Sequence, residues 1–261
     1  MAAIRLPVSR AAIVLRSPAG ADDVALIEAR PLGLPSALAF LARLARGIDG
    51  EAIDLESLPV GDIDVLLLRL RQHLIGDVVN GEDVCPACQA PVDITFTISA
   101  YLAHHVPEAW PGVEPAGDEG WYRLADGTAE FRVPCAGDQL AIATAIEPEQ
   151  ALRQRCVRPN DISASVRREV EAAMEAIAPT LYTQLEGQCP GCGAAVSTTF
   201  DPLLYTLREL RDRAMFVYEE VCAIAHHFHW SETEILTLPA VRRGRYAELA
   251  VRYARQNRTT A

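Results

Sequence analysis

The amino-acid sequence predicts a mainly helical α+β fold that contains two copies of a β-hairpin with a Cys-Pro-x-Cys turn. Helices are indicated by apolar residues that recur every three or four positions, as at Ile63, Leu66 and Leu70. A strand is indicated over residues 92–98, where apolar and polar residues alternate. The segment with this alternation occurs a second time later in the chain, so we expect the hairpin to be duplicated.

The N-terminal segment is expected to form two strands and a helix. Short apolar stretches separated by prolines predict the strands, over residues 11–15 and 24–29. Ser36 is a suitable N-cap for a helix that runs to about Arg46, and Gly47 is a suitable residue to end it.

A longer helix and the first hairpin are predicted next. Pro59 is expected to open the helix and Gly76 to close it, because proline suits the first helical turn and glycine suits the last. Residues 77–84 lead into the first Cys-Pro-x-Cys turn, and residues 92–98 return as the second strand of the hairpin.

The middle of the chain is expected to contain a loop, a different hairpin and two helical stretches. Residues 106–120 are rich in proline, glycine and acidic residues, which is typical of a loop or a boundary. Residues 121–124 and 128–133 flank an Ala-Asp-Gly turn and predict a β-hairpin. A helical pattern interrupted by a Glu-Pro pair covers residues 138–157, and a further helix starts at Asp161.

The last 60 or so residues are expected to be helical throughout, over about residues 203–229, 231–238 and 240–256. The whole chain is long enough to bury a sizeable core. Its predicted segments are the N-terminal strands and helix (1–54), the helix and first zinc knuckle (55–105), the loop, hairpin and helical insertion (106–160), the helix and second zinc knuckle (161–205), and the C-terminal helical tail (206–261).

Residues 85–101 and 189–205 are two copies of one motif, separated by a constant offset of 104 residues. They are CPACQAPVDITFTISAY and CPGCGAAVSTTFDPLLY, and eight of the seventeen positions are identical. Each Cys-x-x-Cys turn supplies two thiolates, half of the closed four-sulfur shell of a structural zinc ion. We therefore expect one structural Zn²⁺ per chain in a zinc-ribbon-like unit. The expected ligands are Cys85, Cys88, Cys189 and Cys192.

Two other interpretations of the paired cysteines stay open. The turns could be buried or degenerate knuckles without metal, or a redox dithiol, although the motif occurs twice and lacks a nearby tryptophan or a βαβ context. The remaining Cys135, Cys156 and Cys222 lie in apolar stretches and are expected in the core. His104 and His105 end the first copy and are candidates for additional ligands.

Composition favours a cytoplasmic protein that does not bind membranes or nucleic acid. A net charge of −11 opposes contact with phosphate backbones and anionic lipids. No apolar run reaches the roughly 18 residues of a membrane helix, and the N-terminal apolar stretch is too short for a signal peptide. All 24 basic residues are arginine, which suits bidentate contacts with carboxylates at protein interfaces.

The sequence does not indicate catalysis. His226, His227 and His229 form an HHxH cluster, but they do not share one helix face, and there is no HExxH motif. No glycine-rich phosphate loop, GxSxG elbow or dinucleotide fingerprint occurs. A closed four-cysteine shell also leaves no position for a catalytic water, so we expect neither enzyme activity nor a small-molecule substrate.

An apolar and arginine-rich cluster near the C-terminus is a candidate partner-binding surface. Trp230, Arg242, Arg243 and Tyr246 belong to the residue types that contribute most to binding energy at interfaces. The same cluster would also suit a seam between two packed helices, with its arginines in solvent.

Four stretches, spanning about residues 55–256, carry a resemblance to a known family. They are LPVGDIDVLLLRLRQHLIGD followed by the CPAC turn, FRVPCAGDQLAIA with the later LRQRCV, LEGQCPGCGAAVSTTFDPLLY, and EEVCAIAHHFHWSETEILTLPAVRRGRYAELAVRYA. In these stretches the chain resembles the T4-type baseplate hub assembly proteins of contractile phage tails and contractile injection systems. The turns alone are common among zinc proteins, whereas their order together with the WSExEILxLPxxRR tail is more specific.

The resemblance implies a structural or assembly component of a baseplate. Such a protein would act as a chaperone or connector, bind other tail or baseplate proteins, and lack enzyme activity. It would be cytoplasmic or incorporated in a phage-tail-like particle. A second hypothesis is a zinc-ribbon nucleic-acid-binding accessory protein, against which the negative net charge argues. A third is a metal hydrolase that uses the histidine cluster.

Overall fold

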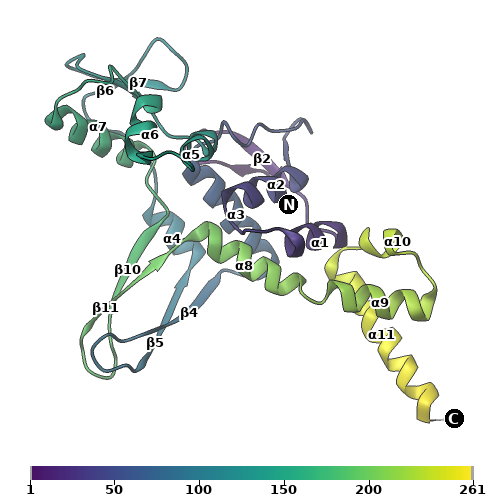
Figure 1. Ribbon diagram of the computed structural model, residues 1–261. Coiled ribbons are helices and arrows are strands. Elements are labelled where there is room, and N and C mark those ends of the chain that lie inside the picture. The colour runs from purple at the N-terminus through teal and green to yellow at the C-terminus, as the bar shows by residue number, and fades with distance from the viewer. Residues whose placement is uncertain (1, 260–261) are drawn as a thin grey trace. The chain divides into compact units, whose positions relative to one another are not determined.

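Figure 1 shows the computed structural model of the protein, which describes residues 2–259. Helices and strands are both present, which confirms the predicted α+β class. The chain divides into two compact units. Unit 1 comprises the described parts of Met1–Ala3, Val14–Ile53 and Leu204–Ala261, and unit 2 comprises Ile4–Ile13 and Asp54–Leu203.

Unit 1 is mainly helical. Its elements are α1 (Gly20–Glu28), α2 (Leu34–Leu44), β3 (Ala45–Gly47), α8 (Pro202–Ala214, whose first two residues belong to unit 2), α9 (Val217–Phe228), α10 (Glu232–Leu236) and α11 (Ala240–Thr259). Helix α2 buries Leu38, Leu41 and Leu44 on one face, as the helical spacing of its apolar residues requires. Helix α11 packs along α9.

Two predictions for the N-terminal segment are wrong. Most of residues 24–29 lie in α1 and not in a strand, because a short apolar run does not distinguish a helix from a strand. The Asp22 carboxylate accepts the backbone N–H of Ala19 at 2.9 Å and thereby caps this helix. Helix α2 begins at Leu34, before the predicted cap, and the Ser36 hydroxyl accepts the N–H of Gly33 from within the first turn.

The helix predicted over residues 203–229 is two helices. Helix α8 ends at Ala214 and α9 begins at Val217, and the two residues between them, Met215 and Phe216, are exposed. The apolar spacing continues through this break, so periodicity alone does not reveal it. The helices predicted over residues 231–238 and 240–256 are confirmed as α10 and α11, with small shifts of their ends.

Unit 2 contains both Cys-Pro-x-Cys turns. Strand β1 (Ile4–Arg5) pairs with β2 (Ala12–Leu15, whose last two residues belong to unit 1). The other elements of unit 2 are α3 (Val60–Leu74), β4 (Val78–Val84), β5 (Pro91–Thr97), α4 (Ile98–His104), β6 (Val113–Pro115), β7 (Trp121–Leu124), β8 (Glu130–Arg132), α5 (Ala136–Ile142), α6 (Pro148–Cys156), β9 (Val157–Arg158), α7 (Ala164–Ile177), β10 (Thr183–Gln188) and β11 (Ala195–Phe200). The helix predicted between Pro59 and Gly76 is confirmed as α3.

The predicted insertion forms a small antiparallel sheet of four strands in the order β6-β7-β8-β9. The hairpin predicted around the Ala-Asp-Gly turn is confirmed as β7 and β8. Phe131 of β8 and Val157 of β9 form a buried cluster with Val170 of α7, so this helix covers the sheet. Helix α7 begins at Ala164, later than predicted, because the Ser163 side chain caps it by accepting the N–H of Val166.

Candidate metal centre

The two hairpins of unit 2 have the same strand register. In the first, Val84 pairs with Pro91, and 104 positions later Gln188 pairs with Ala195. The correspondence holds at every pair of the shorter hairpin, β10–β11. Figure 1 shows the hairpins β4–β5 and β10–β11 beside each other, with both turns at the end remote from the helices. The sequence repeat is therefore a structural repeat.

The two turns also share their backbone conformation. In each, the N–H of the first cysteine, Cys85 or Cys189, donates to the carbonyl oxygen of the alanine five residues later, at 2.9 Å in both. The residue after the second cysteine has a left-handed backbone, with φ of 61° at Gln89 and 73° at Gly193. Its N–H donates to the carbonyl oxygen of the first cysteine, again at 2.9 Å in both turns. Each turn thus holds its two thiols in the same arrangement.

The four cysteine sulfurs of these turns come together. The Sγ atoms of Cys85, Cys88, Cys189 and Cys192 all lie within 4.8 Å of one another. Two contacts between the turns are equal: Cys85 Sγ to Cys192 Sγ and Cys88 Sγ to Cys189 Sγ are both 3.7 Å. Four sulfurs placed tetrahedrally around an ion at about 2.3 Å would be about 3.8 Å apart. The site can therefore hold a metal ion, and the sulfur spacing fits a tetrahedral one.

The site is half enclosed. Cys85 and Cys189 are buried, whereas Cys88 and Cys192 are exposed, so each turn contributes one sulfur to the inside and one to the outside. Val92 and Val196, which occupy equivalent positions in the two copies, are buried against the inner pair. An apolar floor of this kind keeps water away from one side of the sulfurs and favours binding of a cation by thiolates.

Two thiols of the site, those of Cys85 and Cys192, have pKa values shifted in opposite directions. The backbone N–H groups of Cys88 and Ala87 lower the pKa of the Cys85 thiol to about 7, against the effect of desolvation. The N–H of Ala194 lowers the pKa of the Cys192 thiol, but hydrogen bonds with the Cys88 and Cys85 thiols, together with a smaller effect of desolvation, outweigh it and raise the value to about 12. Four thiolates so close together repel one another, and a bound dication removes this repulsion.

Aromatic residues join the two copies at the other end of the hairpins. Phe96 and Phe200, which are equivalent positions, pack edge to face with ring centroids 5.0 Å apart. The Tyr101 ring packs on Phe200 at 5.2 Å, and its buried hydroxyl donates to the carbonyl oxygen of Leu181. Contacts at both ends therefore hold one hairpin against the other.

The structural repeat extends beyond the two seventeen-residue copies of the motif. Helix α3 starts at Val60 and α7 at Ala164, again 104 positions apart, and each precedes a hairpin. Likewise α4 follows the first hairpin and α8 follows the second. The helices share few identical residues, so their correspondence is visible in the order and spacing of elements and not in the residue types.

The other cysteines lie apart from this site. Cys156 is buried and Cys135 is half-buried, and both thiols donate to the buried carboxylate of Asp138. The expectation that Cys222 belongs to the core is wrong, because this residue is exposed on α9. Apolar residues close to Cys222 in the sequence lie on the buried face of α9, whereas Cys222 itself lies on the exposed face.

The histidine cluster does not form a metal site. Among the described residues, the four cysteines are the one group of three or more potential ligands that meets the distance for sharing an ion. The ring of His227 stacks on Tyr253 at 5.6 Å, and His229 adopts a left-handed backbone at the end of α9. His105 Nδ1 lies 2.8 Å from the carbonyl oxygen of Tyr101, so it and its neighbour His104 are also outside the site.

The four residues of the candidate partner surface differ in how far they are exposed. Trp230 and Tyr246 are half-buried and in edge-to-face contact at 4.9 Å, and Arg242 is exposed. Arg243 is only 2% exposed and forms ion pairs with Asp23 and Glu220 of unit 1. Its predicted contact with a partner does not fit this placement, because the guanidinium is already enclosed.

Asp64 of α3 is a buried acidic residue that was not among the candidate functional residues predicted from the sequence. This carboxyl group is buried, and its burial together with the negative charge of Asp201 raises its pKa to about 8. The residue falls within the apolar stripe of α3, between Ile63 and Val65, and an acidic residue at such a position is the signal that could have found it.

Comparison with protein-family models, curated proteins and solved structures gives no match to this chain. None of the helices in residues 2–259 combines the length and apolar character needed to cross a bilayer.

Proposed function

We propose that this protein is a non-enzymatic structural or assembly component of the baseplate of a contractile phage tail or tail-like injection system, stabilised by one structural zinc ion. The observation that carries the metal assignment is the convergence of four sulfurs at tetrahedral spacing from two equivalent turns. The role in a baseplate is supported by the resemblance of residues 55–256 to baseplate hub assembly proteins.

The donor set fits zinc in chemistry as well as in spacing. Four thiolates in a tetrahedral arrangement are typical of zinc or iron centres, whereas magnesium and calcium prefer oxygen ligands. Such a shell is complete with protein ligands and leaves no position for a substrate or an activated water. In this role the ion, when bound, cross-links the two hairpins, and Cys85, Cys88, Cys189 and Cys192 hold it.

Metal analysis of the purified full-length protein tests the site. We expect about one zinc per chain and no visible absorption from an iron–thiolate centre. The double variant Cys88→Ser/Cys192→Ser removes one sulfur from each turn and should lose both metal and thermal stability. Cys222→Ser is the matched control, because this exposed cysteine lies outside the site and its loss should change neither. Full zinc retention in the double variant would exclude the proposed ligands.

Purification of the tagged protein from cells that express a complete contractile-tail gene cluster tests the proposed role. Tail or baseplate proteins should co-purify with it. Replacing Trp230 and Arg242 by alanine should reduce this recovery while zinc content is kept, since the half-buried aromatic and the exposed arginine offer contact area outside the metal site. Arg168→Ala, at an exposed position of α7, is the control. Recovery of nucleic acid alone would favour the zinc-ribbon alternative and contradict the proposal.

A further inference from the structure

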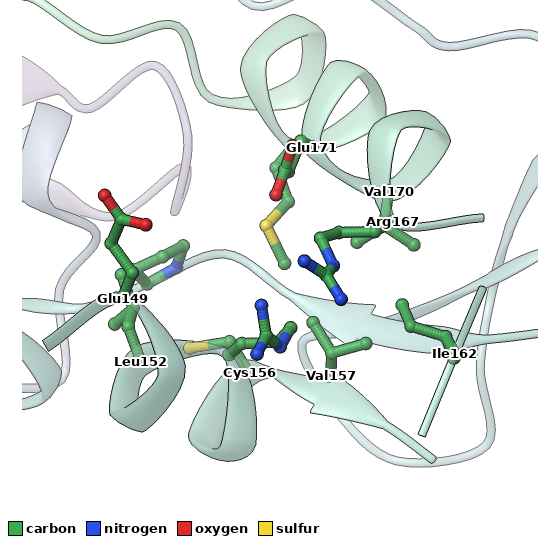
Figure 2. Close-up of a pocket in the computed structure, with 11 residues that line it drawn as sticks. Glu149, Leu152, Cys156, Val157, Ile162, Arg167, Val170 and Glu171 are labelled. Carbon is green, nitrogen blue, oxygen red and sulfur yellow. The ribbon is translucent and has the colours of Figure 1, made fainter. Parts of the chain in front are cut away.

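Unit 2 contains a second feature that the metal centre does not use, a cavity between α6 and α7. Its volume is about 250 Å³. Figure 2 shows Leu152 and Cys156 on α6, Val157 on β9, and Arg167 and Val170 on α7 around this space. The walls are mostly apolar, and further apolar lining residues are Pro134, Ile162 and Met174. A space of this kind suits one or two large apolar groups and is small for a cofactor.

One polar atom in the wall has no partner. The Nε of Arg167 is buried, and among the described residues no atom accepts a hydrogen bond from it. A buried donor without an acceptor is costly, because it has lost its water and gained nothing in exchange. Figure 2 shows the Arg167 side chain reaching from α7 into the cavity. The Nε itself is covered by neighbouring atoms, so a small movement of this side chain would bring its N–H to an acceptor on a bound molecule.

The charged residues around the cavity are not paired with one another. Arg153 and Arg167 each lie one helical turn from a glutamate that also lines the cavity, Glu149 and Glu171, yet neither forms an ion pair in the described structure. Arg155, two positions along α6 from Arg153, does pair, with the buried Asp138 at 2.8 Å. The two cavity arginines are therefore available to an added anion.

The same surroundings limit the charge of that anion. Two arginines and two glutamates line the cavity, so their formal charges cancel and the lining offers no net positive charge to a dianion such as phosphate. The thiol of Cys156 adds no negative charge, because burial raises its pKa to about 12. A single carboxylate attached to an apolar group matches one buried donor and apolar walls.

We propose that this cavity binds a monocarboxylate carried on a small branched or aromatic apolar group. The Nε–H of Arg167 donates to the carboxylate, and Leu152, Val170 and Met174 contact the apolar group. The ligand is either a free short-chain acid or the apolar C-terminal residue of another protein, since both present the same chemistry. This binding site is independent of the metal centre and of the proposed baseplate role.

Binding to the zinc-loaded full-length protein, followed by NMR of its methyl groups and by calorimetry, tests the proposal. The probes are 4-methylpentanoate and an acetylated tripeptide that ends in leucine with a free carboxylate, each compared with its amide. We expect saturable binding of the acid with a dissociation constant on the order of millimolar, and shifts of the Leu152, Val170 and Met174 methyls. The amides should bind at least about tenfold more weakly than the acids, because they lack the charge that Arg167 recognises.

Arg167→Gln should weaken binding of the acids about tenfold, to the level of the amides. Arg168→Gln, the exposed neighbour on α7, is the matched control and should bind as the unaltered protein does. Tighter binding of the peptide than of the free acid would identify a chain terminus as the source, and the reverse would identify a small acid. Equal binding of acid and amide, no saturable binding of either acid, or full binding by Arg167→Gln would overturn the proposal. The acid–amide comparison decides the question even if Arg167→Gln does not fold.

Discussion

Arg243 is a charged residue in the interior of unit 1. Its Nη2 lies 2.7 Å from an Asp23 carboxylate oxygen, and its Nε lies 2.6 Å from Glu220. Gly20 leaves the room for it, because a Cβ at that position would lie 2.6 Å from Arg243 Nη1. Burial nevertheless raises the pKa of Asp23, so the ion pair does not fully offset the desolvation of that carboxyl group.

Removing this guanidinium should be costly. Arg243→Leu leaves Asp23 buried without its cation, and we expect a loss of roughly 3–5 kcal/mol in the free energy of unfolding, measured by urea denaturation. Arg242→Leu, at the neighbouring exposed position, should change it by less than about 0.5 kcal/mol. If Arg243→Leu and Arg242→Leu changed the free energy of unfolding by similar amounts, the Arg243 side chain would not be buried against Asp23 and Glu220.

Asp64 should make stability depend on pH. Its folded pKa of about 8 lies above the ordinary value of 3.8, so between these pH values the folded protein binds more protons than the unfolded chain. Stability contributed by the protonated carboxyl is therefore lost as pH rises towards 8. Asp64→Asn should remove this loss. Its effect on the free energy of unfolding, relative to the unaltered protein, should therefore be roughly 2–4 kcal/mol more stabilising at pH 8 than at pH 5.

The relevant measurement is the difference in unfolding free energy between Asp64→Asn and the unaltered protein from pH 5 to pH 8. Using the difference cancels the effect of pH on the cysteine ligands, which both proteins share. Asp161→Asn, at an exposed carboxylate, is the control and should show no such trend. A difference that stays constant with pH would show that Asp64 is already ionised at pH 5.

At the scale of elements, the two turns provide a matched pair for measuring backbone strain. Gln89 and Gly193 have the same left-handed conformation, but only glycine adopts it without steric cost. Gln89→Gly should therefore stabilise the hairpin by about 0.5–1 kcal/mol, and Gly193→Gln should destabilise it by about 1 kcal/mol. A Cβ added at Gly193 meets no atom within 4 Å, so the expected cost comes from the backbone conformation and not from a clash. Thermal denaturation of the zinc-loaded variants would measure both effects, and a loss of stability in Gln89→Gly would contradict this account.

The elements that the sequence predicts well are those with a long, one-sided apolar pattern or a local turn signal. Helix α3 and the β7–β8 hairpin are examples. The sequence also predicts the ligand set, because two turns with two thiols each require one another to complete a tetrahedral shell. Their convergence follows from a repeat that is visible in the residues themselves.

Other elements depend on partners far away in the chain. The helical state of residues 20–28 is stabilised by Asp22, which pairs with Arg16 and with Arg43 of α2. The burial of Arg243 depends on Asp23, which precedes it by 220 positions. The cavity beside Arg167 exists because α6 and α7 pack with a gap, and no local pattern of residues encodes a gap. These features follow from tertiary packing and are invisible to periodicity.

At the scale of the whole molecule, metal removal should act on one unit. A two-stranded hairpin is marginally stable alone, and the expected metal adds binding energy of about 10–16 kcal/mol to the folded state. Chelation should therefore increase amide hydrogen exchange in β4, β5, β10 and β11, while α9 and α11 of unit 1 keep their protection. Cys192→Ser should reproduce this pattern without chelator and Cys222→Ser should not. A uniform rise in exchange over both units would show instead that the metal supports the entire chain.

The separation of the two turns along the chain has a consequence for biosynthesis. Cys85 and Cys88 leave the ribosome 104 residues before their partners. At translation rates of about 5–20 residues per second, the nascent protein carries two unprotected thiols for roughly 5 to 20 seconds. Oxidation or capture by another thiol in that interval would prevent the shell from closing, so the yield of correctly assembled protein should depend on how reducing the cell is during synthesis.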